Sequence, residues 1–326
     1  MPTPAGLFVL VLALGCAAHA GHENGDPAAL APGDHRLSLR HDGRTRRYVI
    51  HVPPQAREGR PLPVVIVFHG GGGNGGGMQA FTRTDGVADR EGFLVVYPDG
   101  TGRWRRRLLT WNAGTCCGYA RDHRVDDVGF VRAMLDDLAN NTPVDARRVY
   151  ATGHSNGGMM AYRLAAEGSD RIAAIAPVSG GMVVDSIRSP RAVPVLHIHS
   201  VDDPRALYGG GVGPPFPFTN VRVTHPKMDS VIARWVAFDR CPATAAVGDT
   251  VRGQPGSPAA THTATPHTYG PCADGSEVVL WKLTGAGHVW PGAKEQAWQE
   301  YVGPPTDVID ANTVIWQFFQ RFSLPR

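Results

Sequence analysis

Residues 148–166 read RVYATGHSNGGMMAYRLAA, and this stretch decides the fold. Its first five residues have the β-branched and aromatic character of a strand, and Gly157 to Ala166 has the apolar spacing of a helix. Between the two, Gly153, Ser155 and Gly157 form the pattern G-x-S-x-G, which indicates a sharp strand–helix turn. Such a turn presents its serine at a helix N-terminus, where backbone N–H groups stabilise negative charge. A glycine-rich turn with a solvent-facing serine has the same letters, so the flanking strand and helix carry the prediction of a nucleophile.

Strands and helices alternate along the rest of the chain. The first element expected is an antiparallel hairpin within residues 35–53, turning at Asp42-Gly43. Several later strands are continuous apolar runs, which are typical of strands buried on both faces. This order predicts an α/β fold, with a mainly parallel sheet, helices on both faces and one catalytic domain over residues 35–326. We expect further strands within residues 64–68, 92–98, 148–152, 172–178, 193–198 and 278–283, and helices over residues 125–138, 157–166, 229–238 and 308–322.

Composition and charge narrow the class of protein. The chain has 326 residues, of which 42% are hydrophobic, enough for a sizeable core. Its 40 glycines and 27 prolines indicate a loop-rich globular enzyme. One basic cluster surrounds Trp104, but no nucleic-acid-binding module accompanies it, so a solvated loop or a contact for an anionic substrate is expected. We expect a monomer without a nucleic-acid partner. The cluster comprises Arg103, Arg105, Arg106 and Arg107.

The N-terminus resembles an export signal. Residues 7–14 form an apolar run too short to span a bilayer, and Ala18-His19-Ala20 provides a small-x-small cleavage site. Residues 1–20 are therefore predicted to be a signal peptide and residues 21–34 a disordered leader. The mature protein is then secreted or periplasmic, without a transmembrane segment. Lysine and arginine are missing ahead of the apolar run, and an alternative is a lipoprotein anchored through Cys16.

An acid and a histidine follow Ser155 in the order found in α/β-hydrolases, which is nucleophile, acid, histidine. Asp202 and Asp203 come directly after the strand within residues 193–198, where a carboxylate is needed to orient a histidine. Either aspartate fits this position, and the other then braces the loop. His288 lies between glycines in a loop after the last strand, which lets its ring approach the serine.

The oxyanion hole and the substrate pocket are expected around the same turn. The N–H of Asn156 provides one oxyanion donor, and the glycine-rich loop after the strand within residues 64–68 provides the other at Gly71. Residues 208–225 are predicted to form one wall of the acyl pocket, or else a passive surface loop. This segment contains Pro214, Phe216 and Phe218. The other expected pocket residues are His69, Gly70, Trp111, His154 and Trp290.

Taken in order, these segments resemble the exported polyhydroxybutyrate depolymerase and feruloyl esterase-like family of α/β-hydrolases. The resemblance covers about residues 47–322. It implies a serine esterase that needs no cofactor and no metal, acting on a small or oligomeric ester. The matching segments are Phe68 to Gly71, Tyr97 to Gly100, Trp111 to Gly114, Cys116 to Gly118, Val125 to Phe130, Gly153 to Met159 and Gly287 to Gly292.

The resemblance also selects the acid and one disulfide. The family typically carries His-Gly-Thr-x-Asp-Pro after the relevant strand, and residues 199–204 align with it, so the acid falls on Asp203. Ser200 and Val201 depart from that pattern. Family members often have a disulfide that ties a late helix to the strand region, and Cys241 and Cys272 match those positions.

Cys116 and Cys117 are less clear from the sequence. Export makes disulfides permissible, whereas a zinc site normally has a spacer between its paired cysteines. Neighbouring Cα atoms lie about 3.8 Å apart, below the separation of roughly 4.4–6.8 Å usual for disulfides. A bond between the two cysteines is therefore expected to be strained, and it is the less secure of the two pairings.

These observations predict an exported serine esterase with the triad Ser155, His288 and Asp203. A serine peptidase on the same fold is one alternative, although neither an added propeller nor a charge anchor for a peptide terminus is evident. A non-catalytic binding protein with a hydrolase fold is another. An intact triad argues against it, because binding alone does not require all three residues.

Overall fold

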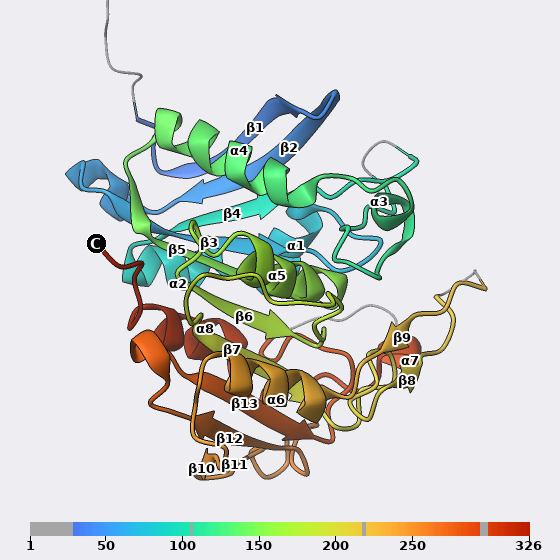
Figure 1. Ribbon diagram of the computed structural model, residues 1–326. Coiled ribbons are helices and arrows are strands. Elements are labelled where there is room, and N and C mark those ends of the chain that lie inside the picture. The colour runs from blue at the N-terminus through green and yellow to red at the C-terminus, as the bar shows by residue number, and fades with distance from the viewer. Residues whose placement is uncertain (1–28, 105–106, 217–219, 294–298) are drawn as a thin grey trace, which may run out of the picture.

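The computed structural model describes residues 29–104, 107–216, 220–293 and 299–326 (Figure 1). The predicted signal peptide, Cys16 and the first part of the predicted leader lie outside these residues. In the described part of the chain, no helix is both long and apolar enough to cross a membrane.

An eleven-stranded sheet runs through the molecule, as expected from the alternation of strands and helices (Figure 1). Its central strands β4, β3, β5, β6, β7 and β13 are mutually parallel, and β2 and β12 continue it antiparallel on either side. The α/β-hydrolase type of fold is thereby confirmed. In spatial order the strands are β1 (Gly33–His41), β2 (Arg44–Val52), β4 (Leu94–Pro98), β3 (Leu62–Phe68), β5 (Val144–His154), β6 (Ala174–Val178), β7 (Val195–Ser200), β13 (Val278–Thr284), β12 (Thr263–Tyr269) and β10 (Ala246–Val247), with β11 (Val251–Arg252) also paired to β12.

Helices cover both faces of this sheet. On one face α4 (Asp127–Asn141), α5 (Asn156–Glu167) and α6 (Met228–Phe238) pack into one hydrophobic core. On the other face α1 (Gly75–Thr82), α2 (Asp85–Glu91) and α8 (Ala311–Phe319) pack into a second core. The smaller elements are η1 (Pro54–Glu58), α3 (Gly118–Asp122), β8 (Gly211–Val212), β9 (Thr224–His225), η2 (Ala273–Gly275) and α7 (Gln299–Val302).

Strand β3 shows why a continuous apolar run indicates a central strand. All seven residues from Leu62 to Phe68 are buried. Successive side chains point to opposite faces, so Ile66 packs with α4 and α5, whereas Val65 and Val67 join the core beneath α8. Both faces of the strand are therefore apolar, as the sequence predicts.

The predicted hairpin is confirmed, and its two-residue turn has a local cause. Strands β1 and β2 pair from Gly33 opposite Val52 to His41 opposite Arg44. Asp42 and Gly43 both have positive φ, at 46° and 69°. This is the backbone that Asp-Gly adopts most readily and that matches the twist of paired strands. The sequence did not predict the short strands β8 to β11 or the longer strand β12. Strand β12 contains Pro266 and polar residues that resemble a loop.

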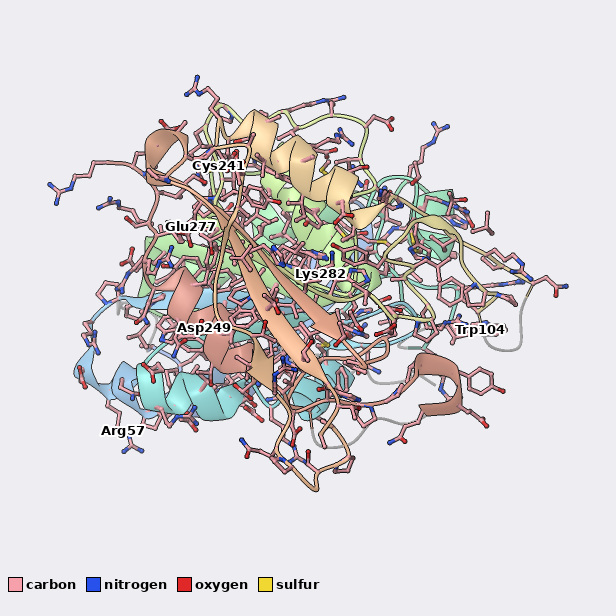
Figure 2. The ribbon with its side chains drawn as sticks, turned by 90° about the horizontal axis from the view of Figure 1, so that it is seen from below. Arg57, Trp104, Cys241, Asp249, Glu277 and Lys282 are labelled. Carbon is pink, nitrogen blue, oxygen red and sulfur yellow. A yellow bond between two sulfur atoms is a disulfide. The ribbon has the colours of Figure 1, made fainter. Side chains whose placement is uncertain are left out.

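The described residues contain two disulfides. Cys241, just after α6 (Figure 2), is bonded to Cys272, which precedes β13, in agreement with the pairing implied by the resemblance. The loop that this bond closes contains β10, β11 and β12. Cys116 and Cys117 are bonded to each other, across a cis peptide.

Candidate active site

Ser155, Asp203 and His288 lie together at the carboxyl-terminal ends of three strands of the parallel sheet. Ser155 directly follows β5, Asp203 follows β7 and His288 lies in the loop after β13. The strand order β5-β6-β7-β13 makes these carboxyl ends neighbours (Figure 1). Side chains at the carboxyl ends of neighbouring parallel strands are the usual source of a site in an open α/β sheet.

The turn that carries Ser155 is strained and depends on glycine. Ser155 has φ 56° and ψ −121°, a conformation that costs a non-glycine residue on the order of 1–3 kcal/mol. Its N–H donates to the carbonyl of Val178 at 2.9 Å, which fixes the turn. A Cβ at Gly153 would lie 2.6 Å from the carbonyl carbon of Gly157, and a Cβ at Gly157 would lie 2.3 Å from the carbonyl oxygen of Phe68. Any larger residue would therefore push the helix away from the strand.

Asp203 holds the ring of His288. The Nδ1 of His288 lies 2.8 Å from Oδ2 of Asp203. The other carboxylate oxygen accepts the backbone N–H groups of Arg205 and Ala206 at 2.7 and 2.8 Å. Burial raises the pKa of Asp203, but His288 and His199 outweigh that effect and hold the pKa well below its ordinary value. The carboxylate is therefore ionised and fixes the tautomer of His288 with its hydrogen on Nδ1.

Asp202 has a different position from Asp203. It is exposed, and its Oδ2 accepts the N–H of Gly285 at 2.7 Å. This bond ties the loop after β7 to the start of the loop that carries His288. The structure thus places Asp203 against the histidine and Asp202 at the base of the histidine loop.

The glycine-rich loop after β3 lies against the serine turn. An added Cβ at Gly70 would lie 3.5 Å from Cβ of Ser155, and one at Gly71 would lie 3.8 Å from Cβ of Asn156. In the described loops and turns, neither the N–H of Gly71 nor that of Asn156 donates to a backbone carbonyl. The loop and the start of α5 thus adjoin at the position where an oxyanion hole is expected.

Trp111 forms hydrogen bonds to both the glycine-rich loop after β3 and the start of α5. Its backbone N–H donates to Oδ1 of Asn156 at 2.7 Å, and its carbonyl accepts from Nδ2 of the same side chain at 3.1 Å. Its indole Nε1 donates to the carbonyl of His69 at 3.0 Å. The side chain is fully buried. The expectation that Trp111 lines the substrate pocket is therefore corrected: it braces the two loops from inside the core.

His69 and Trp290 are corrected in the same way. Both are buried, His69 at 1% and Trp290 at 2% exposure. Nδ1 of His69 bonds to the carbonyl of Gly70, and Nε2 accepts the N–H of Gly100 at 2.9 Å, while burial lowers its pKa to about 4. Trp290 donates from Nε1 to Oδ1 of Asn312 at 3.2 Å. These rings sit next to functional residues in sequence but have their polar atoms bonded inside the protein.

His154 remains beside the nucleophile. Its ring lies 4.6 Å from the ring of His288, between centroids, and 5.8 Å from that of Phe81. Burial lowers its pKa well below the ordinary value, as does the proximity of His288, so the ring is neutral at pH 7. The sequence gives no signal that Phe81 contacts His154, because Phe81 is one apolar residue on an ordinary helix.

The segment 208–225 contributes one aromatic ring near the glycine-rich loop. Cε1 of Phe216 lies 3.8 Å from where a Cβ of Gly71 would be. His225 at the end of this segment has its pKa lowered to about 4 by burial, with a smaller effect from the charge of His288. Phe218, also expected at this wall, lies outside the described residues.

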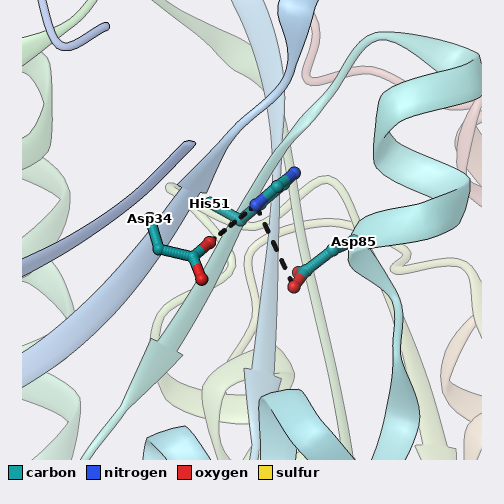
Figure 3. A group of neighbouring side chains, drawn as sticks. All are labelled: Asp34, His51 and Asp85. Atoms are coloured by element: carbon teal, nitrogen blue, oxygen red, sulfur yellow. Dashed lines mark hydrogen bonds and ion pairs between the residues drawn. The ribbon is translucent and has the colours of Figure 1, made fainter. Parts of the chain in front are cut away.

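In the described part of the chain, one set of side chains lies close enough together to hold a metal ion (Figure 3). It consists of Asp34 on β1, His51 on β2 and Asp85 on α2. His51 Nδ1 is 2.7 Å from Asp34 and 3.9 Å from Asp85, and its Nε2 is 2.9 Å from Asp89. Burial lowers the pKa of His51, but hydrogen bonds to the carboxylates outweigh it and the pKa is raised. Both ring nitrogens are already bonded to carboxylates. The group is therefore an ion-pair cluster that ties the hairpin to α2.

The basic cluster predicted from the sequence faces solvent where it is described. Trp104 is 61% exposed at the periphery (Figure 2), and the guanidinium carbon of Arg103 is 5.6 Å from its ring centroid. Arg105 and Arg106 lie outside the described residues.

The protein family and the relatives that this chain resembles are all named as esterases. A protein-family model described as "Esterase PHB depolymerase" matches residues 46–243. The protein NocK of Nocardia uniformis subsp. tsuyamanensis, whose name assigns it as an esterase, is 35% identical over 77% of this chain and 72% of its own length. The bifunctional acetylxylan esterase/xylanase XynS20E of Neocallimastix patriciarum is 29% identical over 73% of this chain, and feruloyl esterase B of Piromyces equi is 24% identical over 86%. The chain spans 30% and 46% of the length of these two proteins.

Among solved structures, an acetyl xylan esterase from Aspergillus awamori superposes with a TM-score of 0.53. It is 16% identical, and the match covers 78% of this chain and 94% of that structure. At this identity the likeness concerns the fold.

Proposed function

Because this chain belongs to the Esterase PHB depolymerase family, we propose that it is an exported serine esterase that uses Ser155, His288 and Asp203 as its triad. That it hydrolyses carboxylic esters agrees with all the relatives described above. The observation that carries the triad is the buried Asp203–His288 pair, which lies at the same sheet edge as the strained Ser155 turn.

In the first half of the reaction, Oγ of Ser155 attacks the ester carbonyl carbon while its proton moves to Nε2 of His288. Asp203 keeps the other ring nitrogen protonated, which makes Nε2 the basic one, and stabilises the imidazolium that forms. The N–H groups of Asn156 and Gly71 bind the oxyanion. The tetrahedral intermediate then expels the alcohol, which takes the proton from Nε2, and the acyl group stays on Ser155.

In the second half, water attacks the acyl carbon and His288 accepts one of its protons. The second tetrahedral intermediate collapses, the acid leaves, and the proton returns to Oγ of Ser155. Each half requires the same two oxyanion donors. This explains why Trp111 fixes the loop of His69 and the side chain of Asn156 together.

The acid part of the substrate is proposed to be a ferulate-like aromatic group or a hydroxybutyrate oligomer. The ring of Phe216 near Gly71 and that of Phe81 on His154 support the aromatic acid, because aromatic side chains pack well against a planar acyl group. We propose hydrolysis of methyl ferulate ahead of acetylated xylan and hydroxybutyrate oligomers. Side-by-side rates on the three substrates test this order, and a higher kcat/KM on either of the other two would reverse it.

Replacement of the nucleophile tests the function itself. Ser155→Ala is expected to remove hydrolysis of p-nitrophenyl acetate down to the residual rate from binding and the oxyanion hole. Ser186→Ala is a matched control, because Ser186 is exposed. Unchanged turnover in Ser155→Ala would contradict the assignment. Absence of any ester hydrolysis by the wild type would favour a binding protein, and cleavage of a peptide anilide in preference to esters would favour the peptidase alternative.

Export is proposed from the predicted signal at residues 1–20 together with the disulfides, which persist in oxidising compartments. N-terminal sequencing of the mature protein is expected to begin at Gly21. A mature N-terminus at Cys16 carrying lipid would instead support the anchored form.

A further inference from the structure

Behind Asp203, a chain of hydrogen-bonded side chains runs into the core. Nε2 of His199 lies 3.3 Å from Oδ2 of Asp203, the oxygen that also binds His288. Nδ1 of His199 is 3.0 Å from Nε2 of His197, and Nδ1 of His197 is 3.1 Å from the hydroxyl of Tyr162. All three are buried, with exposures of 2%, 0% and 0%.

The partners of these side chains determine which atom carries each hydrogen. Nε2 of His199 also lies 2.7 Å from the carbonyl of Ala206, which only accepts, so this nitrogen carries a hydrogen. Nδ1 of His199 is then the acceptor for Nε2 of His197. Burial lowers the pKa of His197 well below its ordinary value, so its Nδ1 in turn accepts from Tyr162. The hydrogen bonds from Tyr162 to His197 and from His197 to His199 therefore point toward Asp203. The hydrogen on Nε2 of His199 is bonded to the carbonyl of Ala206 at 2.7 Å, and the same nitrogen lies 3.3 Å from Oδ2 of Asp203.

The chain also joins the two elements whose relative position matters for the reaction. His197 and His199 lie on β7, which leads into Asp203. Tyr162 lies on α5, which begins directly after Ser155. A shift of α5 against β7 would change the placement of the nucleophile relative to the acid, and the hydrogen bond from Tyr162 to His197 opposes it.

We propose that His199, His197 and Tyr162 are positioning residues that hold Asp203 in the orientation required by His288. This proposal rests on the proposed esterase function. Oδ1 of Asp203 accepts two backbone N–H groups, while Oδ2 is bonded to Nδ1 of His288 and lies 3.3 Å from Nε2 of His199. In the described part of the chain, His288 and His199 are the side chains paired with this carboxylate. The carboxylate thus has one orientation available, and His199 links that orientation to α5.

Two replacements of His199 separate positioning from packing. In His199→Gln the amide nitrogen takes the place of Nε2 and still donates toward Asp203. In His199→Asn the amide oxygen takes the place of Nδ1 and still accepts from His197, but the donor toward Asp203 is lost. We expect His199→Asn to lower kcat about tenfold or more with KM unchanged, because a donor to a charged group is lost. His199→Gln is expected to retain kcat to within about threefold.

Tyr162→Phe tests the far end of the chain without altering the triad. Its expected loss of kcat is smaller than that of His199→Asn, because it acts through two further residues. Tyr150→Phe is the matched control, because it also removes the hydroxyl of a buried tyrosine, one that donates to the carbonyl of Phe322 at 2.7 Å instead of to a histidine. It is expected to leave kcat unchanged. Thermal unfolding of each variant records any loss of stability separately.

A proton NMR resonance of His288 distinguishes a positioning role of His199 from a role in stability alone. The Nδ1–H of His288, bonded to Asp203, is expected to give a low-field proton resonance, which shifts or broadens in His199→Asn and stays in His199→Gln and Tyr150→Phe. Equal kcat in the two His199 variants, or an unmoved resonance with only a lower Tm, would overturn the proposal. A wild type that hydrolyses no ester would refute the proposed function instead, and the resonance still tests the link from His199 to the pair.

Discussion

Replacing Asp203 by asparagine removes one charge and turns one hydrogen-bond acceptor into a donor. The oxygen of the new amide is needed by the N–H groups of Arg205 and Ala206, at 2.7 and 2.8 Å in the wild type. Its NH₂ group then faces Nδ1 of His288, where two donors meet. The ring relieves this by moving its hydrogen to Nε2, and it can no longer accept the proton of Ser155.

The expected loss follows from that wrong tautomer. The same exchange in a serine protease triad lowers kcat about 10⁴-fold, which corresponds to about 5.5 kcal/mol in the activation free energy. KM is expected to change little, because Asp203 is buried and does not reach the substrate. The fold is expected to remain, since asparagine has nearly the same shape as aspartate.

Asp202→Asn is the matched control for this prediction. The asparagine oxygen still accepts the N–H of Gly285, and the lost charge lies in solvent. Its kcat is expected to stay within about threefold of wild type, and its stability within about 0.5 kcal/mol. Both variants are compared by initial rates on p-nitrophenyl acetate, after circular dichroism has confirmed that they are folded. Equal losses in the two variants, or a larger loss in Asp202→Asn, would refute the reasoning.

Three further predictions concern the stability of the fold: a glycine at the serine turn, the Cys241–Cys272 disulfide and the buried His69. Gly157→Ala is expected to destabilise the protein by about 3 kcal/mol or more, because its Cβ would lie 2.3 Å from the carbonyl oxygen of Phe68; a midpoint of urea unfolding equal to wild type would contradict this. Loss of the Cys241–Cys272 bond in a double serine variant is expected to lower the free energy of unfolding by about 3–4 kcal/mol for a loop of this length, measured by urea unfolding against wild type. His69, whose folded pKa is lowered to about 4, contributes stability that is present above about pH 6.5 and is lost as the pH falls toward 4. Urea unfolding across this range is expected to show a weaker pH dependence in His69→Gln than in wild type, and equal slopes would show that His69 does not titrate as described.

The fold was predictable where the sequence pattern is determined by local physics. The apolar run of β3 and the Asp42-Gly43 turn both have one favourable structure, and the protein adopts it. Strand β12 was not predictable, because Pro266 and its polar neighbours become a strand only through pairing with β13. That pairing joins two different strands, so no pattern within β12 alone records it.

The candidate site shows the same division. The serine turn is visible in the sequence because such a tight turn requires glycine. The acid and the histidine are visible because each follows a predicted strand, in the order nucleophile, acid, histidine. The pocket was predicted poorly, since Trp111 and Trp290 look like substrate contacts beside functional motifs and are core residues instead. The role of His199 was hidden for a related reason: alternation along β7 places it with His197, but only the fold brings Tyr162 to them.

Covalent labelling tests most directly whether Ser155 is the nucleophile. The purified protein is treated with a p-nitrophenyl alkylphosphonate, which reacts with an activated serine, and is then examined by intact mass and peptide mapping. We expect a single adduct on the peptide that contains Ser155, complete loss of ester hydrolysis as the adduct forms, and no adduct in Ser155→Ala. An adduct on another residue that accompanies the loss of activity, or continued hydrolysis after Ser155 is fully labelled, would contradict this expectation.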